Sequence, residues 1–378
     1  MLAGGLTLLT GGVAHAAQQD SPSAPQFLNT ALTVKFVGSA ACRECHGAIS
    51  RVFDGTSHMR STTAATVDML AFALRGRDQL RVRGLAPAVD YVLTRHDNRL
   101  SFSYSLGPRE ADAHAFPIEY RVGSGRQGIS LLAREPDGRL WQVPVSYFTE
   151  ADRWDLSPGF AAVLQQYGPF FRRQIPQNCL TCHATYLELE PSGKFGPVVH
   201  GVSCEKCHGP GAVHVRHWRG RTSRGPSGSR TKADLTIVNP KRLPADLQRA
   251  ICAECHTRTL TPREGKTFQF RPGQRLENFY ELHASEAGAQ HTEAESLARS
   301  ACFQRTAGKE RLACVVCHAP HASPTRDPSL HDGVCLGCHR EEHKASGVRH
   351  VNCVGCHMPE RRTDFGHGRF RNHHIAVY

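Results

Sequence analysis

Long apolar runs are missing from this sequence of 378 residues. The longest, from Leu2 to Val13, is too short to cross the hydrocarbon core of a bilayer, which takes about 20 residues in a helix. No other stretch is longer, so the sequence predicts no membrane-spanning segment. Hydrophobic residues make up only 40% of the chain, which indicates that part of the apolar interior comes from something other than side chains.

Cysteine and histidine, by contrast, are abundant and fall into one repeated motif. Seven copies of Cys-x-x-Cys-His occur among 15 cysteines and 23 histidines. Two cysteines three positions apart can each form a thioether with a vinyl group of one haem, and the histidine that follows then lies beneath the ring and binds the iron. The cysteines are Cys42 and Cys45, Cys179 and Cys182, Cys204 and Cys207, Cys252 and Cys255, Cys314 and Cys317, Cys335 and Cys338, and Cys353 and Cys356. The predicted proximal ligands are His46, His183, His208, His256, His318, His339 and His357. The motif therefore predicts seven covalently attached haem c groups.

Zinc sites and disulfides are the alternatives for paired cysteines. A zinc site takes four ligands and so usually two such pairs, and it does not require a histidine directly after each pair. Seven is an odd number of pairs, and all seven are followed by histidine. The pattern therefore favours haem attachment over both alternatives.

The formal net charge of +12 does not predict a nucleic-acid-binding protein. Haem propionates would lower the total to roughly +5. Arginines cluster between Arg216 and Lys232, among glycine, serine and threonine. This cluster is either a solvated loop or a docking patch for an acidic redox partner.

The N-terminus predicts export. Ala14-His15-Ala16 resembles a signal-peptide cleavage site with the cut before Ala17, although no basic residues precede the apolar run. Haem is attached to c-type cytochromes outside the cytoplasm, so we expect a periplasmic or exported protein associated with the cell envelope. An uncleaved anchor is the alternative.

The spacing of the motifs predicts four regions. These are a signal peptide with a disordered leader (1–36), a first haem segment (37–62), a β-rich insert without a haem motif (63–178), and a haem-dense body with six motifs (179–378). So many motifs in the last region leave no room for an ordinary side-chain core. The predicted fold class is mainly α and irregular, with haems at the core and a small antiparallel β insert.

Alternating residues and turn signals predict the strands of the insert. Asp97 and Asn98 form a turn between residues 91–93 and 100–104. Further strands are predicted at 118–122, 129–133 and 140–145. The intervening Gly123-Ser124-Gly125-Arg126 is a hairpin turn rather than a phosphate-binding loop, because it lacks the required spacing and a following helix.

Methionine is scarce, with 4 residues in the chain, so bis-histidine ligation should dominate and favour low reduction potentials. The predicted distal ligands are His58, His214, His321, His343, His367, His373 and His200, with His350 competing for the last place. His15, His96, His114 and His331 are not expected to bind iron.

Several segments resemble one family, the large multihaem c-type cytochromes related to cytochrome c554. The segments are 201–211 around Cys204, 314–321, 353–359 with the later His367 and His373, the single residues His58 and His214, and the non-haem stretches 143–146 and 154–159. The resemblance implies electron transfer but no particular substrate. Many members of this group carry tetratricopeptide repeats after the last histidines, and this chain ends at Tyr378, so we expect a form without the repeats.

Three functions are consistent with this pattern. The favoured one is an electron-transfer protein with redox partners as donor and acceptor, a membrane-associated quinol-oxidising complex among the candidates. The second is an oxidoreductase acting on a small nitrogen or sulfur compound at an open iron, for which the first haem is the best candidate because the insert separates it from the others. The third is a filament-forming subunit. No catalytic residue is predicted, and Cys302 lies outside every motif, where it is either a buried thiol, an iron ligand or a redox-reactive group.

Overall fold

The structure is a computed structural model. It describes residues 26–86, 89–105, 115–190, 194–220, 233–283, 292–305, 312–325, 327–339, 352–362, 367 and 369–378. Among these, about 32% are helical and about 27% lie in strands. The predicted signal peptide, its cleavage site, His114, His343, His350 and the arginine cluster after Gly220 lie outside the described residues.

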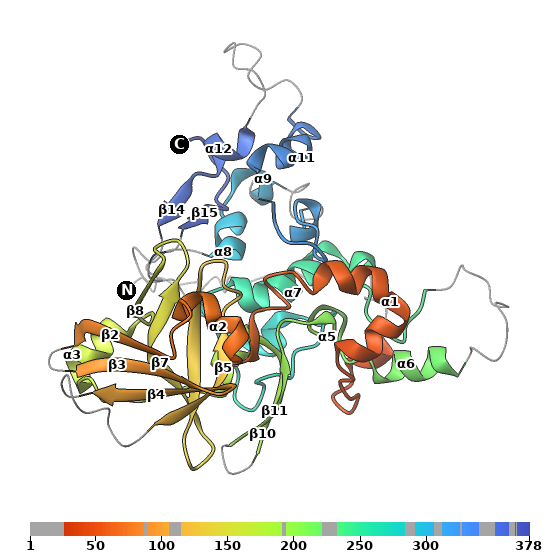
Figure 1. The fold of residues 1–378 in the computed structure, drawn as a ribbon. Coiled ribbons are helices and arrows are strands. Elements are labelled where there is room, and N and C mark those ends of the chain that lie inside the picture. Colours follow the sequence, from red (N-terminus) through yellow and green to blue (C-terminus); the bar gives the residue numbers. More distant parts are fainter. Residues whose placement is uncertain are drawn as a thin grey trace, which may run out of the picture.

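A nine-stranded antiparallel sheet is the largest element of the structure. Its main path runs β2-β3-β4-β5-β6-β7-β8, while β1 pairs with β5 and β9 with β7. The strands are β1 (Thr62–Ala64), β2 (Gln79–Ala86), β3 (Val89–His96), β4 (Arg99–Ser105), β5 (Phe116–Val122), β6 (Gly128–Arg134), β7 (Leu140–Phe148), β8 (Arg153–Leu156) and β9 (Arg173–Gln174). Strands β2 to β4 cross over the others at the lower left of Figure 1.

The predicted hairpins are confirmed. Strands β3 and β4 pair with Leu93 opposite Phe102, and Asp97 adopts a positive φ of 52° in the turn between them. Strands β5 and β6 pair across the glycine-rich turn, and β7 covers the predicted strand 140–145. Gly123 suits this turn because a Cβ there would lie 2.5 Å from the carbonyl oxygen of Gly128.

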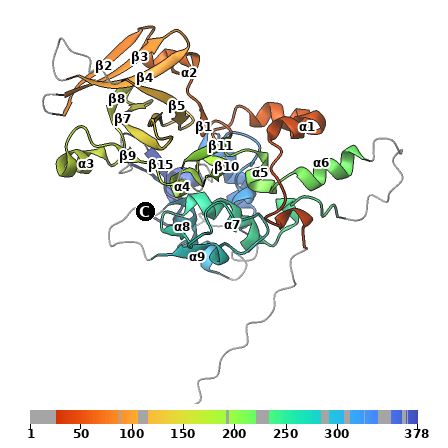
Figure 2. The ribbon, with the colours of Figure 1, turned by 90° about the horizontal axis from the view of Figure 1, so that it is seen from below.

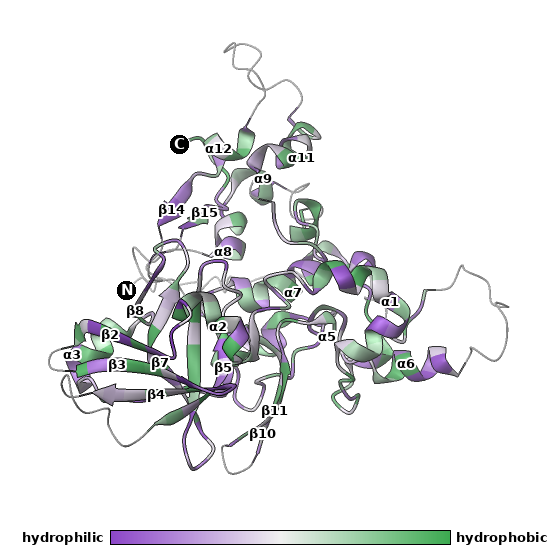
Figure 3. Cartoon of the chain, viewed as in Figure 1, coloured by the Kyte–Doolittle hydropathy of each residue, from purple (hydrophilic) through white to green (hydrophobic). Residues whose placement is uncertain are grey.

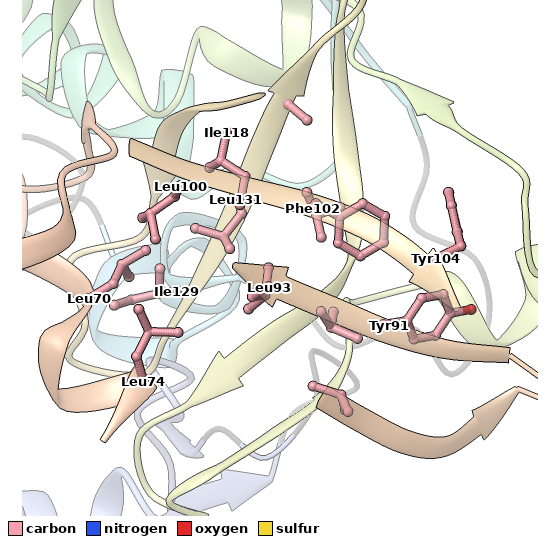
Figure 4. Packing of buried hydrophobic residues seen from close by; sticks show 14 of the residues in the cluster. Leu70, Leu74, Tyr91, Leu93, Leu100, Phe102, Tyr104, Ile118, Ile129 and Leu131 are labelled. Atoms are coloured by element: carbon pink, nitrogen blue, oxygen red, sulfur yellow. The ribbon is translucent and has the colours of Figure 1, made fainter. Parts of the chain in front are cut away.

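The two halves of the sheet enclose an apolar core. Tyr91, Phe102 and Trp141 are fully buried, and the ring of Phe102 meets that of Trp141 edge to face at 5.6 Å. Helix α2 (Val67–Leu74) closes one side with Leu70 and Leu74, as Figure 4 shows. The alternation of apolar and polar residues along these strands therefore forms a conventional side-chain core.

The remaining chain consists of short helices and hairpins. The α-helices are α1 (Ser39–Phe53), α3 (Phe160–Tyr167), α4 (Gln177–Leu180), α5 (Cys204–His208), α6 (Ala212–Arg219), α7 (Ala245–His256), α8 (Glu293–Ala298), α9 (Ala301–Gln304), α11 (Asp332–Leu336) and α12 (Cys353–His357). Single 3₁₀ turns are η1 (Leu28–Thr30), η2 (Pro240–Arg242), η3 (Leu276–Asn278), η4 (Cys314–Val316) and η5 (Pro328–His331). Three hairpins pair β10 (Ala184–Leu189) with β11 (Phe195–His200), β12 (Leu260–Pro262) with β13 (Tyr280–Leu282), and β14 (Glu360–Arg362) with β15 (Arg369–Arg371).

These elements form two arms around α7. Figures 1 and 2 place α7 between the sheet and one arm that contains α1 and α6, and Figure 1 shows α9, α11 and α12 in a second arm. Hydrophilic residues dominate β14 and β15 in that second arm, as Figure 3 shows. No helix among the described residues is long and apolar enough to cross a membrane.

The predicted fold class, mainly α and irregular with a small insert, is wrong, since strands are nearly as frequent as helical residues. The motif needs only one helical turn, so α5 and α12 are five residues long and contribute little helix. The insert instead forms most of a nine-stranded sheet, two more hairpins lie between the motifs, and a third follows the last motif.

The side-chain core thins out along the chain. After Tyr280, the buried hydrophobic residues in the described part of the chain are Ala313 and Val354. The second arm therefore has almost no apolar interior of its own.

Candidate haem-binding sites

Each motif lies on or next to a short helical turn. The backbone N–H of His318 donates to the carbonyl oxygen of Cys314 at 2.9 Å, and that of His339 donates to Cys335 at 2.9 Å. One such turn brings positions i, i+3 and i+4 to the same face, so both thiols and the histidine ring point to one side. This is the arrangement that covalent haem attachment requires.

Apolar side chains next to the motifs are exposed. Ile49 and Val52 follow the first motif on α1 and are 47% and 58% exposed, while Val315 and Val316 inside the fifth motif are 40% and 44% exposed. Exposed clusters of this kind mark binding surfaces, and a porphyrin face is the apolar surface that the motifs themselves imply. The residues present therefore fit haem.

In two motif histidines the Nδ1 atom contacts a backbone carbonyl oxygen. Nδ1 of His208 lies 2.9 Å from the carbonyl oxygen of Val238, and Nδ1 of His357 lies 2.8 Å from that of Ala376. A carbonyl oxygen only accepts, so Nδ1 donates and Nε2 keeps the lone pair that a metal binds. Nδ1 of His373 makes the same contact with the carbonyl oxygen of Arg371, at 3.0 Å.

The electrostatics favour neutral rings at most of these positions. Burial lowers the pKa of His58, His208 and His373. His256 is an exception, because its hydrogen bond with Glu293 raises its pKa. The pKa of Glu293 is lowered to about 2, since burial alone would raise it and the hydrogen bond with His256 overcomes that effect. A carboxylate behind a ligating imidazole is a common way to fix the ring and raise its basicity.

Three motif histidines face a predicted distal histidine. Two imidazoles bound to one iron, with metal–nitrogen bonds of about 2.0–2.1 Å, have ring centroids roughly 6.2 Å apart. The centroids lie 6.3 Å apart for His46 and His214, 6.2 Å for His58 and His256, and 6.0 Å for His208 and His321. The ring planes are nearly parallel in the first and third pairs, at 18° and 12°, and nearly perpendicular in the second, at 80°.

The fifth motif has two candidate partners. The ring of His318 lies 6.0 Å from that of the predicted ligand His373 and 5.7 Å from that of His331. His331 was not expected to bind iron from the sequence. Its three-dimensional position makes it a competitor for this iron.

The other predicted ligands are not brought into such pairs among the described residues. His183 is half-buried, and its Nδ1 atom is buried without a hydrogen-bond partner. The ring of His200 packs against Tyr120 at 5.7 Å, and Nε2 of His367 contacts Asp155 at 3.0 Å. The distal partners of His183, His339 and His357 remain predictions.

Backbone contacts hold His58 in place. Its carbonyl oxygen accepts hydrogen bonds from the N–H groups of Val202, at 2.9 Å, and Ser61, at 3.1 Å. Gly201 allows this close approach, because its φ is +66° and a Cβ there would lie 2.1 Å from the carbonyl oxygen of Met59. The Ser61 hydroxyl donates to the carbonyl oxygen of His183 at 2.9 Å, which joins the same segment to the second motif.

Cysteines of different motifs touch one another. The thiol of Cys42 hydrogen-bonds with that of Cys204, which raises the pKa of Cys42 and lowers that of Cys204 to about 6. Interactions of the same kind join Cys255 to Cys182, Cys252 to Cys314 and Cys353 to Cys335, whereas Cys207 with Cys252 and Cys317 with Cys335 interact only through longer-range charge effects. The motifs therefore form one connected series, in the order first, third, fourth, fifth, sixth and seventh, with the second attached to the fourth.

Buried polar side chains inside the motifs lock this series together. The Glu205 carboxylate is 2% exposed and accepts from the N–H groups of Val37, Gly38 and Gly211 at 2.7–2.8 Å, which fixes the start of α1 against α5. The Lys206 ammonium lies 3.0 Å from the Glu254 carboxylate, joining the third motif to the fourth.

Truncation of Glu254 is expected to destabilise the protein strongly. The side chains of Lys206 and Glu254 are 9% and 2% exposed, so Glu254→Ala leaves a buried charge without its partner. The expected loss is about 3–5 kcal/mol in the free energy of unfolding, measured by denaturant titration of the ferric holoprotein. The double variant Lys206→Met, Glu254→Leu should recover most of this loss. The exposed pair of Arg43 and Asp54 is the control, and Asp54→Ala should cost about 1 kcal/mol or less.

No group of three or more histidine, cysteine, aspartate or glutamate side chains converges as a metal-ion site in the described part of the chain. The cysteine pairs also lie as free thiols, none joined in a disulfide.

The sites and their spacing support the class of multihaem c-type cytochromes. A family model described as cytochrome c554 and c-prime matches residues 162–209, which include the second and third motifs. The resemblance inferred from the sequence is therefore confirmed.

The fold is similar to that of a solved cytochrome. The crystal structure of the outer cell wall cytochrome OcwA superposes with a TM-score of 0.56 at 17% identity, covering 90% of this chain and 79% of the other. An undecaheme cytochrome from the S-layer of Carboxydothermus ferrireducens gives a TM-score of 0.41 at 16% identity, covering 89% of this chain and 52% of the other. No curated protein sequence matches the chain.

Proposed function

We propose that this chain is an exported heptahaem cytochrome that carries electrons through a series of mostly bis-histidine, low-spin haems. The observation that carries the proposal is the set of histidine pairs at 6.0–6.3 Å, each of which joins a motif histidine to a histidine from a distant part of the chain. An iron with two tightly held imidazoles has no place for substrate and is suited to exchange of single electrons.

The contacts between motifs support a continuous path. Neighbouring cysteines place the edges of successive haems close together, and electron tunnelling depends steeply on that distance. The series begins at α1 and α6 and ends at α11 and α12, at the tips of the two arms in Figure 1. We propose that one redox partner docks on each arm. The predicted four-region division is retained in this proposal, with the region 63–178 as a scaffold against which the haem segments are held.

Location at the cell envelope is part of the proposal. The solved relative with the shared fold is described as an outer cell wall cytochrome. The predicted signal sequence and the attachment of haem c outside the cytoplasm also support export.

An oxidoreductase is the second candidate function, and the surroundings of His183 are the observation that supports it. No histidine ring faces this proximal ligand among the described residues, whereas His46 of the first motif is paired with His214. The second haem is therefore a better candidate for an open iron than the first haem, which the sequence analysis favoured. Nitrite, hydroxylamine or another small ligand of iron would bind there.

One experiment separates the two functions. Mass spectrometry of the purified holoprotein should give seven haems, and EPR with magnetic circular dichroism of the ferric state should show them all low-spin and unchanged by nitrite, hydroxylamine or cyanide. The perpendicular pair His58 and His256 should give a more anisotropic low-spin signal than the two parallel pairs. A high-spin haem that shifts with ligand, and that is lost in Cys179→Ala, Cys182→Ala, would instead assign an open site to the second haem.

A further inference from the structure

A basic cavity lies where the sheet meets the haem segments. Its volume is about 410 Å³, and it is lined by Ser57 and Arg60 from the turn after α1, Arg121 of β5, Arg126 of the β5–β6 turn, and Ser323 from the segment after the fifth motif. Three guanidinium groups and several hydroxyls therefore face one space, and no carboxylate lines it.

Arg121 is the most buried of the three arginines. The residue is 2% exposed, and its Nε has no hydrogen-bond partner. One terminal nitrogen, NH2, donates to the carbonyl oxygen of Arg60 at 3.1 Å, which orients the guanidinium toward the cavity lining. Burial and the charge of Arg60 lower the pKa of Arg121, because two cations lie close together in a poorly solvated place. An unpaired buried N–H group and an uncompensated charge both cost free energy unless a ligand satisfies them.

Arg60 and Arg126 add further positive charge to the cavity. Arg126 donates to the carbonyl oxygen of Pro324 at 3.3 Å, and neither Arg60 nor Arg126 has an acidic partner in the described part of the chain. A planar guanidinium offers paired donors that match the two oxygens of a carboxylate. The ligand that this lining fits is therefore an anion with coplanar oxygens.

The cavity borders two haem positions. Ser57 and Arg60 flank His58, whose ring faces His256 at 6.2 Å, and Ser323 lies two residues after His321, whose ring faces His208 at 6.0 Å. A haem carries its two carboxylates on one edge, several ångströms from the iron. A haem edge directed at this cavity from either position would find its carboxylate partners in the three arginines.

We propose that this cavity binds a carboxylate-type anion, and that the carboxylate is a haem propionate held by Arg60, Arg121 and Arg126. The assignment rests on the proposed haem sites at His256 and His208. A small oxyanion from solution is the other source of the same chemistry. In either case the cavity ties the sheet to the haem segments through an ionic contact.

The test compares Arg121→Gln and Arg126→Gln with Arg99→Gln in the holoprotein. Arg99 is exposed on β4 and does not line the cavity. Its variant removes one positive charge, as the two cavity variants do. Mass spectrometry should count seven haems in each variant. A lower count would contradict the proposed haem sites, whereas a full count lets the other readouts test the cavity alone. If Arg121→Gln does not fold, Arg126→Gln on the more exposed turn still reports on the cavity.

Two readouts distinguish the sources of the anion. With a propionate in place, an EPR-monitored redox titration should show that one haem has a lower reduction potential in both cavity variants than in the wild type. Arg99→Gln should leave that potential unchanged, and acetate and nitrate should not bind. With a free anion, calorimetric titration of acetate or nitrate should show binding by the wild type that weakens at least about tenfold in the cavity variants. The proposal is overturned if both cavity variants match Arg99→Gln in potentials and in anion binding.

Discussion

Removal of the fifth haem is expected to isolate the second arm from the rest of the molecule. Cys314 interacts with Cys252 of the fourth motif, and the charge of Cys317 acts on Cys335 of the sixth, so the fifth motif lies between them in the series. The double variant Cys314→Ala, Cys317→Ala should contain one haem fewer. Electron transfer from the first arm to the last two haems should then slow by orders of magnitude, because tunnelling decays exponentially with distance.

The rate can be followed with a ruthenium photosensitiser attached through Arg216→Cys, on the exposed surface of α6. In the wild type the injected electron should spread over all haems in one fast phase, and in the double variant two haems should stay ferric into a slow phase. Cys302→Ala is the matched control, since this cysteine lies outside every motif and its loss should change neither haem count nor rate. Unchanged kinetics in the double variant would show that the path does not run through the fifth haem.

Exchange of one distal ligand is expected to give the second large effect. His58→Met should raise the reduction potential of the haem at His256, because methionine ligation favours the ferrous state. The expected rise is on the order of 0.1–0.3 V, a part of the ~0.8 V range that axial ligands cover. The backbone hydrogen bonds of His58 do not involve its ring, so the segment should keep its position.

The potential is measured by redox titration, together with the charge-transfer band of methionine-ligated ferric haem. His96→Met is the control, because the His96 side chain is 90% exposed on the sheet. A haem that becomes high-spin in His58→Met, without methionine ligation, would still identify His58 as the ligand. Seven unchanged potentials and an unchanged low-spin spectrum would refute the assignment.

The motif chemistry was accessible from the sequence because it is local. Cys-x-x-Cys-His carries its geometry within a single helical turn, and the hairpin at Asp97 and Asn98 is likewise encoded by neighbouring residues. His58, His214 and His321 could be named as distal ligands because the family resemblance marks those positions, and the structure brings each opposite a motif histidine.

The rest depends on contacts between residues far apart in the chain. The mainly α fold class failed because local patterns do not reveal that β1, β2, β8 and β9 pair with the predicted strands in one nine-stranded sheet. The order of the motifs in space rests on interactions such as that of Cys42 with Cys204, and Glu205 accepts from backbone N–H groups at the start of α1 beside them, which motif spacing does not reveal. His331 was set aside for the same reason, since only tertiary structure brings it to His318.

After Tyr280, the described residues include few buried apolar side chains, which bears on how the protein is made. A polypeptide gains stability by burying apolar surface, so this stretch has little to gain by folding as a bare chain. The sheet, with its own complete core, can fold before any haem arrives. Maturation should thus proceed from a structured scaffold with a protease-sensitive C-terminal tail, and each haem ligated to the tail would convert part of it into resistant structure. Proteolytic quality control would then degrade incompletely loaded molecules from this tail.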